Sequence, residues 1–307
     1  MPGEVPDADA IRKATERLLS KAEAVGRLPT PVQDIIAAAD LVEPQHSMLS
    51  DLVLDQAPAH LRRAIRKLRF KVRAVLDRRA REVHIDPTIQ HRGRLAFKKL
   101  HEVTHDILPW QRALGYADDD ATLSWATRQL FERQANQGAA ELLFQRDLLS
   151  DMARQYETGM AAIIELADLF GASVHATFRR FAETHPQAVA GIVMEQSPCT
   201  THPIAYRRNE VACSQRWASR FGSSPSWPLI LRSPPYSFID LAPRAHSTRS
   251  VVPGDLLLPD VNNNPVRLNV EVYCNSYMLF VLMWQPRNER LRHRRIIVPG
   301  WSEDRTR

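Results

Sequence analysis

The chain has 307 residues, of which 44% are hydrophobic and 25% are charged, as is usual for a globular protein with its own core. The formal net charge is +6, and the longest apolar run, residues 278–284, is far shorter than the roughly 20 residues of a membrane span. The first ten residues lack the apolar stretch of a secretory signal. The three cysteines are odd in number and widely spaced, which argues against a disulfide framework or a cysteine-bound metal. We therefore expect a cytoplasmic protein of about two domains with no membrane segment.

The first part of the chain has helical periodicity in residues 7–25 and again in residues 48–68. Between these stretches, Thr30 is expected to cap a helix, because Pro31 suits its first turn and Gln33 completes a capping box. Basic side chains are dense from residue 61 to residue 81. This basic segment is either a solvated surface or a site that attracts phosphate or acidic partners.

A hairpin and two long helices are expected next. Alternating runs at 71–76 and 81–85 predict two short strands. A helix then runs from about residue 93 to 108, where a proline ends it, and residues 115–120 read as a loop. Asp120 or Thr122 begins a further helix that continues to about residue 149.

The second half of the chain changes in character. Two helices are expected at 156–170 and 173–184, joined by Gly171 as a C-cap and Ser173 as an N-cap. After about residue 196 prolines become frequent and helical periodicity disappears. Strand-like runs follow at 229–231, 237–239 and 256–258, and a hairpin is expected from 268–274 and 277–284.

The motif His101-Glu102-Val103-Thr104-His105 lies on the helix expected at 93–108. Side chains four residues apart share one face of a helix, so the two imidazoles can reach a single zinc ion. Glu102 is rotated by about 100° from His101, which places it beside such an ion, where a general base takes a proton from water. The motif therefore predicts a zinc-dependent hydrolase.

A third ligand is expected from the long helix that follows, which carries Glu132 and Glu141. These two lie nine residues apart and thus on opposite faces, so only one can face the metal. Small residues on the face of Glu132 would let two helices approach closely, which favours Glu132, with Asn136 one turn on to orient it. Glu141 is the alternative ligand.

Peptide hydrolysis also needs a hydrogen-bond donor for the oxyanion of the tetrahedral intermediate. His84, Tyr116 and Tyr156 are the candidates, and the sequence does not choose among them. The strand at 81–85 is expected to offer a free edge to an extended substrate.

Several segments of the sequence, in the same order along the chain, resemble the ImmA/IrrE family of metallo-endopeptidases. The run Arg92–Phe97 with the histidine motif resembles the family's R-x-R-F…A-H-E-[LI]-G-H, and residues 81–87 resemble the strand before it. Residues 132–143 resemble E-x-x-A-N-x-F-A-x-x-L-L, and residues 30–32 resemble the start of the family domain. The resemblance covers about residues 28–150. It implies that His101, His105 and Glu132 bind Zn²⁺ and that Glu102 is the catalytic base.

The predicted elements, taken together with the resemblance, indicate an α+β organisation. Residues 1–150 would form a mainly helical, zincin-like metallopeptidase domain with a small sheet, residues 151–195 a helix-turn-helix-like segment, and residues 196–307 a β-rich domain of unassigned role. The implied partner is a protein substrate, a helix-turn-helix transcriptional repressor whose cleavage releases stress-response genes. Direct nucleic-acid binding is not favoured. The alternative is a nucleic-acid-binding or sensory regulator with a non-catalytic metal site.

The sequence departs from the family pattern at a few positions. Thr104 replaces the usual glycine, Gly138 stands where phenylalanine is frequent, and Phe144–Gln145 replaces a common Met–Pro. Asp106, next to the second histidine, either tunes His105 or binds metal itself. No departure removes a ligand, but all bear on how a substrate fits.

Overall fold

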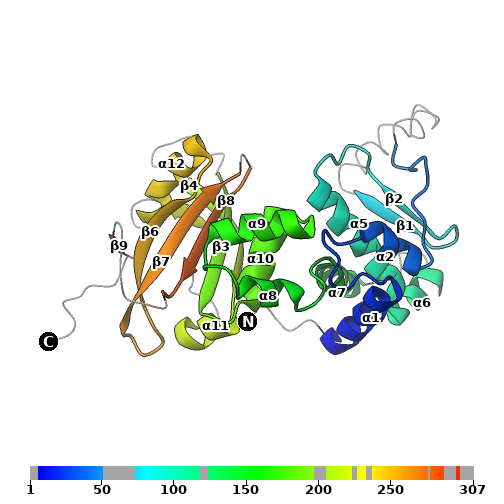
Figure 1. Cartoon of the computed structure of the whole chain (residues 1–307), viewed down its shortest axis with the longest axis horizontal. Helices are drawn as coiled ribbons and strands as arrows, with labels where there is room; N and C mark the ends of the chain where they lie inside the picture. Colours follow the sequence, from blue (N-terminus) through cyan, green and yellow to red (C-terminus); the bar gives the residue numbers. More distant parts are fainter. Residues whose placement is uncertain are drawn as a thin grey trace. The chain divides into compact units, whose positions relative to one another are not determined.

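The computed structural model divides the chain into two compact units, shown in Figure 1. It describes residues 6–50, 73–117, 124–196, 205–222, 227–232, 237–275, 277–286 and 295–297. Gly3–Leu149 with Ala167–Ser173 form one unit, here the helical unit, and Ser150–Leu166 with Val174–Arg307 form the larger part of the other, here the sheet unit. Most of the helix expected at 48–68 and of the basic segment lies outside the described residues. The expected α+β class is confirmed.

The helical unit wholly contains five of the described helices and one small sheet. Its elements are α1 (Ala8–Lys21), α2 (Val32–Ala38), β1 (Ala74–Asp77), β2 (Glu82–Ile85), α5 (Arg92–Ile107), α6 (Pro109–Ala117) and α7 (Trp125–Leu143). Two further helices cross the division between the units, namely α8 (Leu148–Ala153) and α9 (Met160–Phe170). Ile11, Ile35, Leu100 and Leu142 are among its fully buried core residues, so each long helix turns an apolar face inward.

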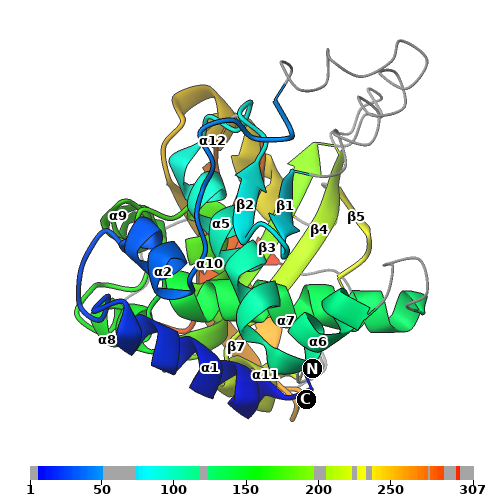
Figure 2. The ribbon, with the colours of Figure 1, turned by 90° about the vertical axis from the view of Figure 1, so that its right-hand side faces the viewer.

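The hairpin of the helical unit follows the expected pairing, with Ala74 opposite Ile85 in an antiparallel ladder. Figure 2 shows β1 and β2 side by side. The carboxylate of Asp77 accepts the N–H groups that begin the turn. Val42 occupies the other edge of β2, because its N–H donates to the carbonyl of Arg81 and its carbonyl accepts from the N–H of Val83. At these positions Val42 therefore occupies the strand edge that was expected to be free for a substrate.

Helices α5 and α7 approach each other closely through small residues. Ala135 and Ala139 of α7 are fully buried. A Cβ atom at Gly138 would lie only 2.3 Å from Cγ2 of Thr104 on α5. Two departures from the family pattern thus meet in space, since the threonine methyl group fills the place that a side chain at 138 would need.

The sheet unit is built on seven described strands in the order β5-β4-β3-β8-β7-β6-β9. Neighbouring strands are antiparallel except for the parallel pair β6 and β9. The strands are β3 (Val189–Gln196), β4 (Ala205–Cys213), β5 (Ile230–Arg232), β6 (Val252–Pro259), β7 (Pro265–Cys274), β8 (Leu279–Trp284) and β9 (Arg295–Ile297). The helices are α10 (Val174–Thr184), α11 (Gln215–Phe221), η1 (Ser237–Leu241) and α12 (Ala242–Thr248).

Both faces of the central strands are covered. Leu279, Val281 and Met283 of β8 belong to the core cluster that also includes Phe238 of η1 and Trp217 of α11. On the other face, Phe280 stacks edge-on against Phe178 of α10 at 5.2 Å between ring centroids. All six residues of β8 are consequently buried, which explains why its sequence is a continuous apolar run without polar alternation.

Several local expectations are wrong. The α2 helix is capped by Pro31 without a side-chain bond, and the Thr30 hydroxyl instead donates to the carbonyl of Leu143. Pro109 begins α6 as well as ending α5, so residues 115–117 are helical and not a loop. Residues 237–241 form a 3-10 helix where a strand was expected. Strands β3 and β4 were not foreseen, whereas the β7–β8 hairpin is confirmed.

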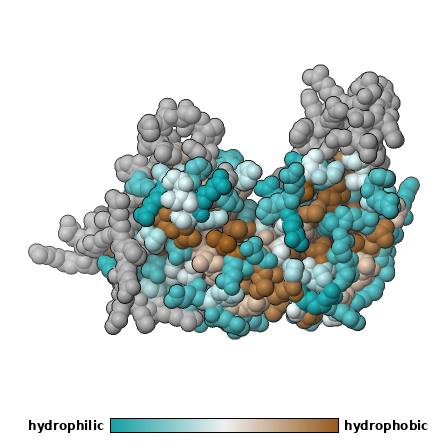
Figure 3. Space-filling model, turned by 45° about the horizontal axis from the view of Figure 1, so that its top comes forward, coloured by the Kyte–Doolittle hydropathy of each residue, from teal (hydrophilic) through white to brown (hydrophobic). Residues whose placement is uncertain are grey.

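Within the described residues, no single helix has the length and apolar character to cross a membrane, although α9 and α10 meet the criterion together as a pair bent by 116°. Figure 3 shows several hydrophobic patches between hydrophilic residues on the face it draws. The exposed large hydrophobics are Val25, Val42, Met48, Trp125, Leu229, Val261 and Tyr277. Single exposed apolar residues of this kind are normal on protein surfaces.

Gly93, in the first turn of α5, packs directly against backbone. A Cβ atom there would lie 2.3 Å from both the carbonyl carbon of Ala172 and the amide nitrogen of Ser173. Helix propensity alone would make Gly93→Ala stabilising by about 1 kcal/mol. Because backbone cannot yield as a side chain can, we expect a net loss of about 1–3 kcal/mol in the free energy of unfolding. Urea denaturation measures it, and exposed Arg94→Ala in the same turn should change stability by less than about 0.5 kcal/mol.

The contact between Gly138 and Thr104 predicts a strong coupling. Gly138→Ala alone should destabilise by about 1–3 kcal/mol, because its methyl group overlaps that of Thr104. In the double variant with Thr104→Ala the nearest remaining atom, Cβ of residue 104, is 3.2 Å away, so most of the loss should be recovered. A double-mutant cycle of unfolding free energies checks this, and additive effects would contradict the contact.

Candidate metal centre

Helix α5 presents the two motif histidines from one face. His91 caps the helix, with its Nδ1 accepting the N–H of Arg94, and the buried residues Leu100 and Val103 fix the opposite side in the core. The rings of His101 and His105 meet edge to face, with centroids 4.8 Å apart. His101 is almost fully buried and His105 largely so. Their Nε2 atoms are 3.2 Å apart, which is the convergence that the spacing predicted.

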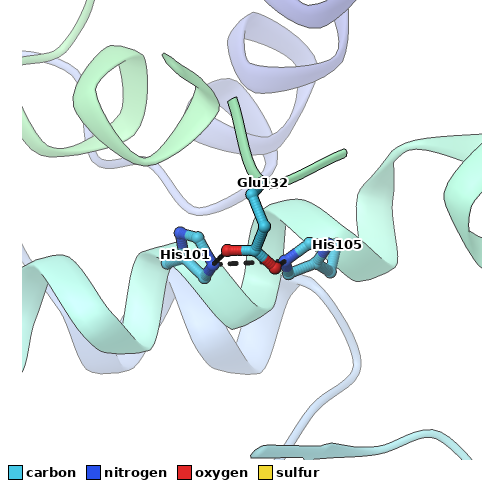
Figure 4. A group of neighbouring side chains, drawn as sticks. All are labelled: His101, His105 and Glu132. Carbon is cyan, nitrogen blue, oxygen red and sulfur yellow. Dashed lines mark hydrogen bonds and ion pairs between the residues drawn. The ribbon is translucent and has the colours of Figure 1, made fainter. Parts of the chain in front are cut away.

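Glu132 of α7 completes the cluster. Its carboxylate oxygens lie 3.3 Å from Nε2 of His101 and 3.5 Å from Nε2 of His105. Figure 4 shows the carboxylate between the two imidazoles. The three ligand atoms all lie within 4.8 Å of one another, and the glutamate side chain remains 61% exposed. One side of the cluster is therefore open to solvent.

The separations of these atoms suit a small tetrahedral ion. Metal–ligand bonds of about 2.0–2.1 Å place neighbouring ligands of a tetrahedron about 3.3–3.4 Å apart. The two Nε2 atoms are 3.2 Å apart, and they lie 3.3 and 3.5 Å from the two different oxygens of the Glu132 carboxylate. Two imidazoles and a carboxylate at these distances, with one side open, can hold a divalent cation.

The outer nitrogens of both imidazoles face amide oxygens. Nδ1 of His101 is 3.1 Å from Oδ1 of Asn136, and Nδ1 of His105 is 2.7 Å from Oε1 of Gln111. An amide oxygen only accepts, so in the neutral imidazole each Nδ1 carries the proton and each Nε2 has its lone pair toward the centre. Two lone pairs and a carboxylate repel one another unless a positive charge lies between them. The donor set therefore fits a cation.

The pKa shifts agree with this reading. Hydrogen bonds from His101 and His105 hold the pKa of Glu132 far below its usual range, despite partial burial. Burial lowers the pKa of His105, but the hydrogen bond with Glu132 and the charge of Glu102 outweigh it, so that pKa is raised. Both shifts show that a positive charge is favoured at this point.

Glu102 lies beside the cluster, as expected from its rotation on α5. It is half-buried, and its charge acts on His105. Asn136 contacts a ligand, although that ligand is His101 and not the glutamate that we expected it to orient. Asp106 is not part of the cluster, because it is buried in an ion pair with Arg81 at 2.6 Å. Glu141 is buried and is not part of the cluster.

The three oxyanion candidates differ in their surroundings. His84 is buried, with Nδ1 accepting the N–H of Met48 and Nε2 3.2 Å from Glu82, so both ring nitrogens already face a neighbour. Tyr156 belongs to the sheet unit and donates to Glu165. Tyr116 lies on α6, and its side chain is outside the described residues. The choice among them stays a prediction.

Gln111 was not foreseen from the sequence. It lies six residues beyond His105, on α6, a helix that was not predicted from the sequence, and no spacing rule connects the two. Only the turn at Pro109, which folds α6 back toward α7, brings the amide to the ring.

The comparisons with known proteins agree with the geometry. Residues 62–181 match the Peptidase_M78 family model, described as the IrrE N-terminal-like domain. A comparison with curated protein sequences gives no match. A solved structure entitled "Mycobacterium tuberculosis transcriptional regulator" is similar over 90% of this chain and 76% of its own, with a TM-score of 0.50 and 13% sequence identity. That likeness concerns the fold.

The family match spans the histidine motif on α5 and the glutamate on α7. It is consistent with the resemblance that the motifs carry. The whole metal cluster therefore lies within residues 62–181, the part of the chain that is similar to the IrrE N-terminal-like domain.

Proposed function

We propose that the protein is a zinc-dependent endopeptidase that cleaves a protein substrate, a helix-turn-helix transcriptional repressor. The observation that carries the proposal is the convergence of His101, His105 and Glu132 on one point with one side open. Two imidazoles and a carboxylate are the ligand set of many catalytic zinc sites, which keep a position for water or substrate.

Different residues around the cluster would have different roles in hydrolysis. Zinc, when bound, supplies Lewis acidity that polarises a carbonyl and makes water nucleophilic near neutral pH. Glu102 is placed beside the cluster to take a proton from the attacking water and to pass it to the leaving amine. Asn136 and Gln111 hold the two imidazoles in orientation from behind.

Two findings support a regulatory substrate. The chain matches the IrrE N-terminal-like domain, and its resemblance to the ImmA/IrrE family implies cleavage of repressors. The similar solved structure is entitled a transcriptional regulator. That title also favours the alternative, a nucleic-acid-binding regulator whose metal site does not catalyse. The two functions differ in what Glu102 does, because only a peptidase needs it as a base.

The metal site predicts about one zinc ion per chain in the purified protein. His101→Ala and Glu132→Ala should lose that zinc, because each removes one of three protein ligands. Glu141→Gln is the matched control, since it changes a carboxylate on the same helix outside the cluster, and it should retain zinc. Elemental analysis measures the content. Loss of zinc in Glu141→Gln together with retention in Glu132→Ala would assign the ligands the other way.

The catalytic role predicts a sharp effect of Glu102→Gln. With a purified helix-turn-helix repressor encoded beside the gene as substrate, cleavage should fall by about 10²–10⁴-fold while zinc content stays unchanged. Fragment formation followed by mass spectrometry measures the rate and locates the scissile bond. Equal cleavage by Glu102→Gln would refute its role as base. An intact substrate with strongly salt-dependent DNA binding by the chain would favour the regulator.

A further inference from the structure

A chain of buried amide side chains leads from His105 to the start of α1. Oε1 of Gln111 lies 2.7 Å from the imidazole Nδ1, and Nε2 of Gln111 lies 2.7 Å from Oε1 of Gln134. Nε2 of Gln134 then lies 3.1 Å from the carboxylate of Asp7, which precedes α1. Gln111 and Gln134 are 1% and 0% exposed.

The groups at the ends of this series of hydrogen bonds determine which atom donates and which accepts in each bond. At the far end, Nε2 of Gln134 faces the carbonyl of Pro6 at 3.2 Å as well as Asp7, and both of these groups only accept. On the other side of the same amide, the indole N–H of Trp110, which only donates, lies 2.9 Å from Oε1. The amide of Gln134 therefore has one allowed orientation, with its oxygen toward Gln111.

The orientation of Gln111 follows from that of Gln134. Its NH₂ group must face the oxygen of Gln134, and it also donates to the carbonyl of Phe131 at 3.4 Å. If the amide were turned over, its oxygen would face two other oxygens in a buried site. The oxygen of Gln111 is thus held against Nδ1 of His105, where it can only accept.

From this directed chain we infer that Gln111 is a positioning residue, which holds His105 in the Nδ1–H tautomer and so keeps the Nε2 lone pair toward the metal. The inference rests on the proposed metal site. Gln134 acts one step further out, because it fixes Gln111. His101 has no comparable chain among the described contacts, since its Asn136 partner is exposed on α7. The two motif histidines are consequently held by different means.

The decisive variants replace each amide with methionine, which is similar in length but offers no strong acceptor. In the full chain, Gln111→Met should weaken zinc binding by about 10–100-fold, as loss of such outer partners usually does. Gln134→Met should act in the same direction by a smaller factor. Gln129→Met, an exposed glutamine of α7, is the control and should bind zinc as the unmodified protein does. Competition with a chelator measures the dissociation constants.

Nitrogen-15 NMR of the histidine rings in the metal-free protein provides an independent readout. At alkaline pH the unmodified protein and Gln129→Met should show His105 as the Nδ1–H tautomer, whereas Gln111→Met should shift it toward Nε2–H. Unchanged tautomer and zinc affinity in a folded Gln111→Met would overturn the inference. If Gln111→Met does not fold, the same two measurements on Gln134→Met decide it. Absence of zinc binding in the unmodified protein would instead refute the proposed function, while the tautomer result would still stand.

Discussion

The close approach of α5 and α7 is the constraint on which the metal cluster depends. Ligand atoms on two helices must meet within a few tenths of an ångström, and side chains of glutamate and histidine are short. Ala135, Ala139 and Gly138 remove bulk from α7 where it crosses the motif helix. Thr104 adds bulk at the same crossing and uses the space left by Gly138. Packing and metal binding therefore both require that α5 and α7 lie close together, and Thr104 and Gly138 meet this requirement as a pair.

The buried charged residues near the metal cluster are neutralised by ion pairs of their own. Asp106 follows directly after a ligand and is almost fully buried, yet Arg81 neutralises it from the end of the hairpin turn. Lys99, also buried on α5, is paired with Glu43. These local ion pairs leave the carboxylates of Glu132 and Glu102 as the negative groups that act on the two imidazoles. The uncompensated negative charge that favours a bound cation therefore lies at the metal cluster.

The sequence predicts those features that depend on regular periodicity. The spacing of His101 and His105, and the opposite faces of Glu132 and Glu141, follow from 3.6 residues per turn, and the structure brings together the set expected. The β7–β8 hairpin follows from its two apolar runs. In contrast, the partner of Thr30, the bond of Asn136 and the position of Gln111 depend on how distant segments pack, and no local pattern encodes them. Strand β3 was missed because its residues 189–194 are all buried, so its sequence lacks the polar alternation by which a half-exposed strand is recognised.

The uneven burial of the three ligands has a consequence for the kinetics of metal exchange. The two imidazoles are enclosed and held from behind, whereas the carboxylate of Glu132 is 61% exposed. Of the three groups that would hold an ion, the carboxylate is thus the one that solvent reaches directly. Chelators and competing metals could approach the site from this side without any unfolding of the helices. Such a centre would exchange its ion more readily than a closed structural site, and its occupancy would then follow the supply of metal around it.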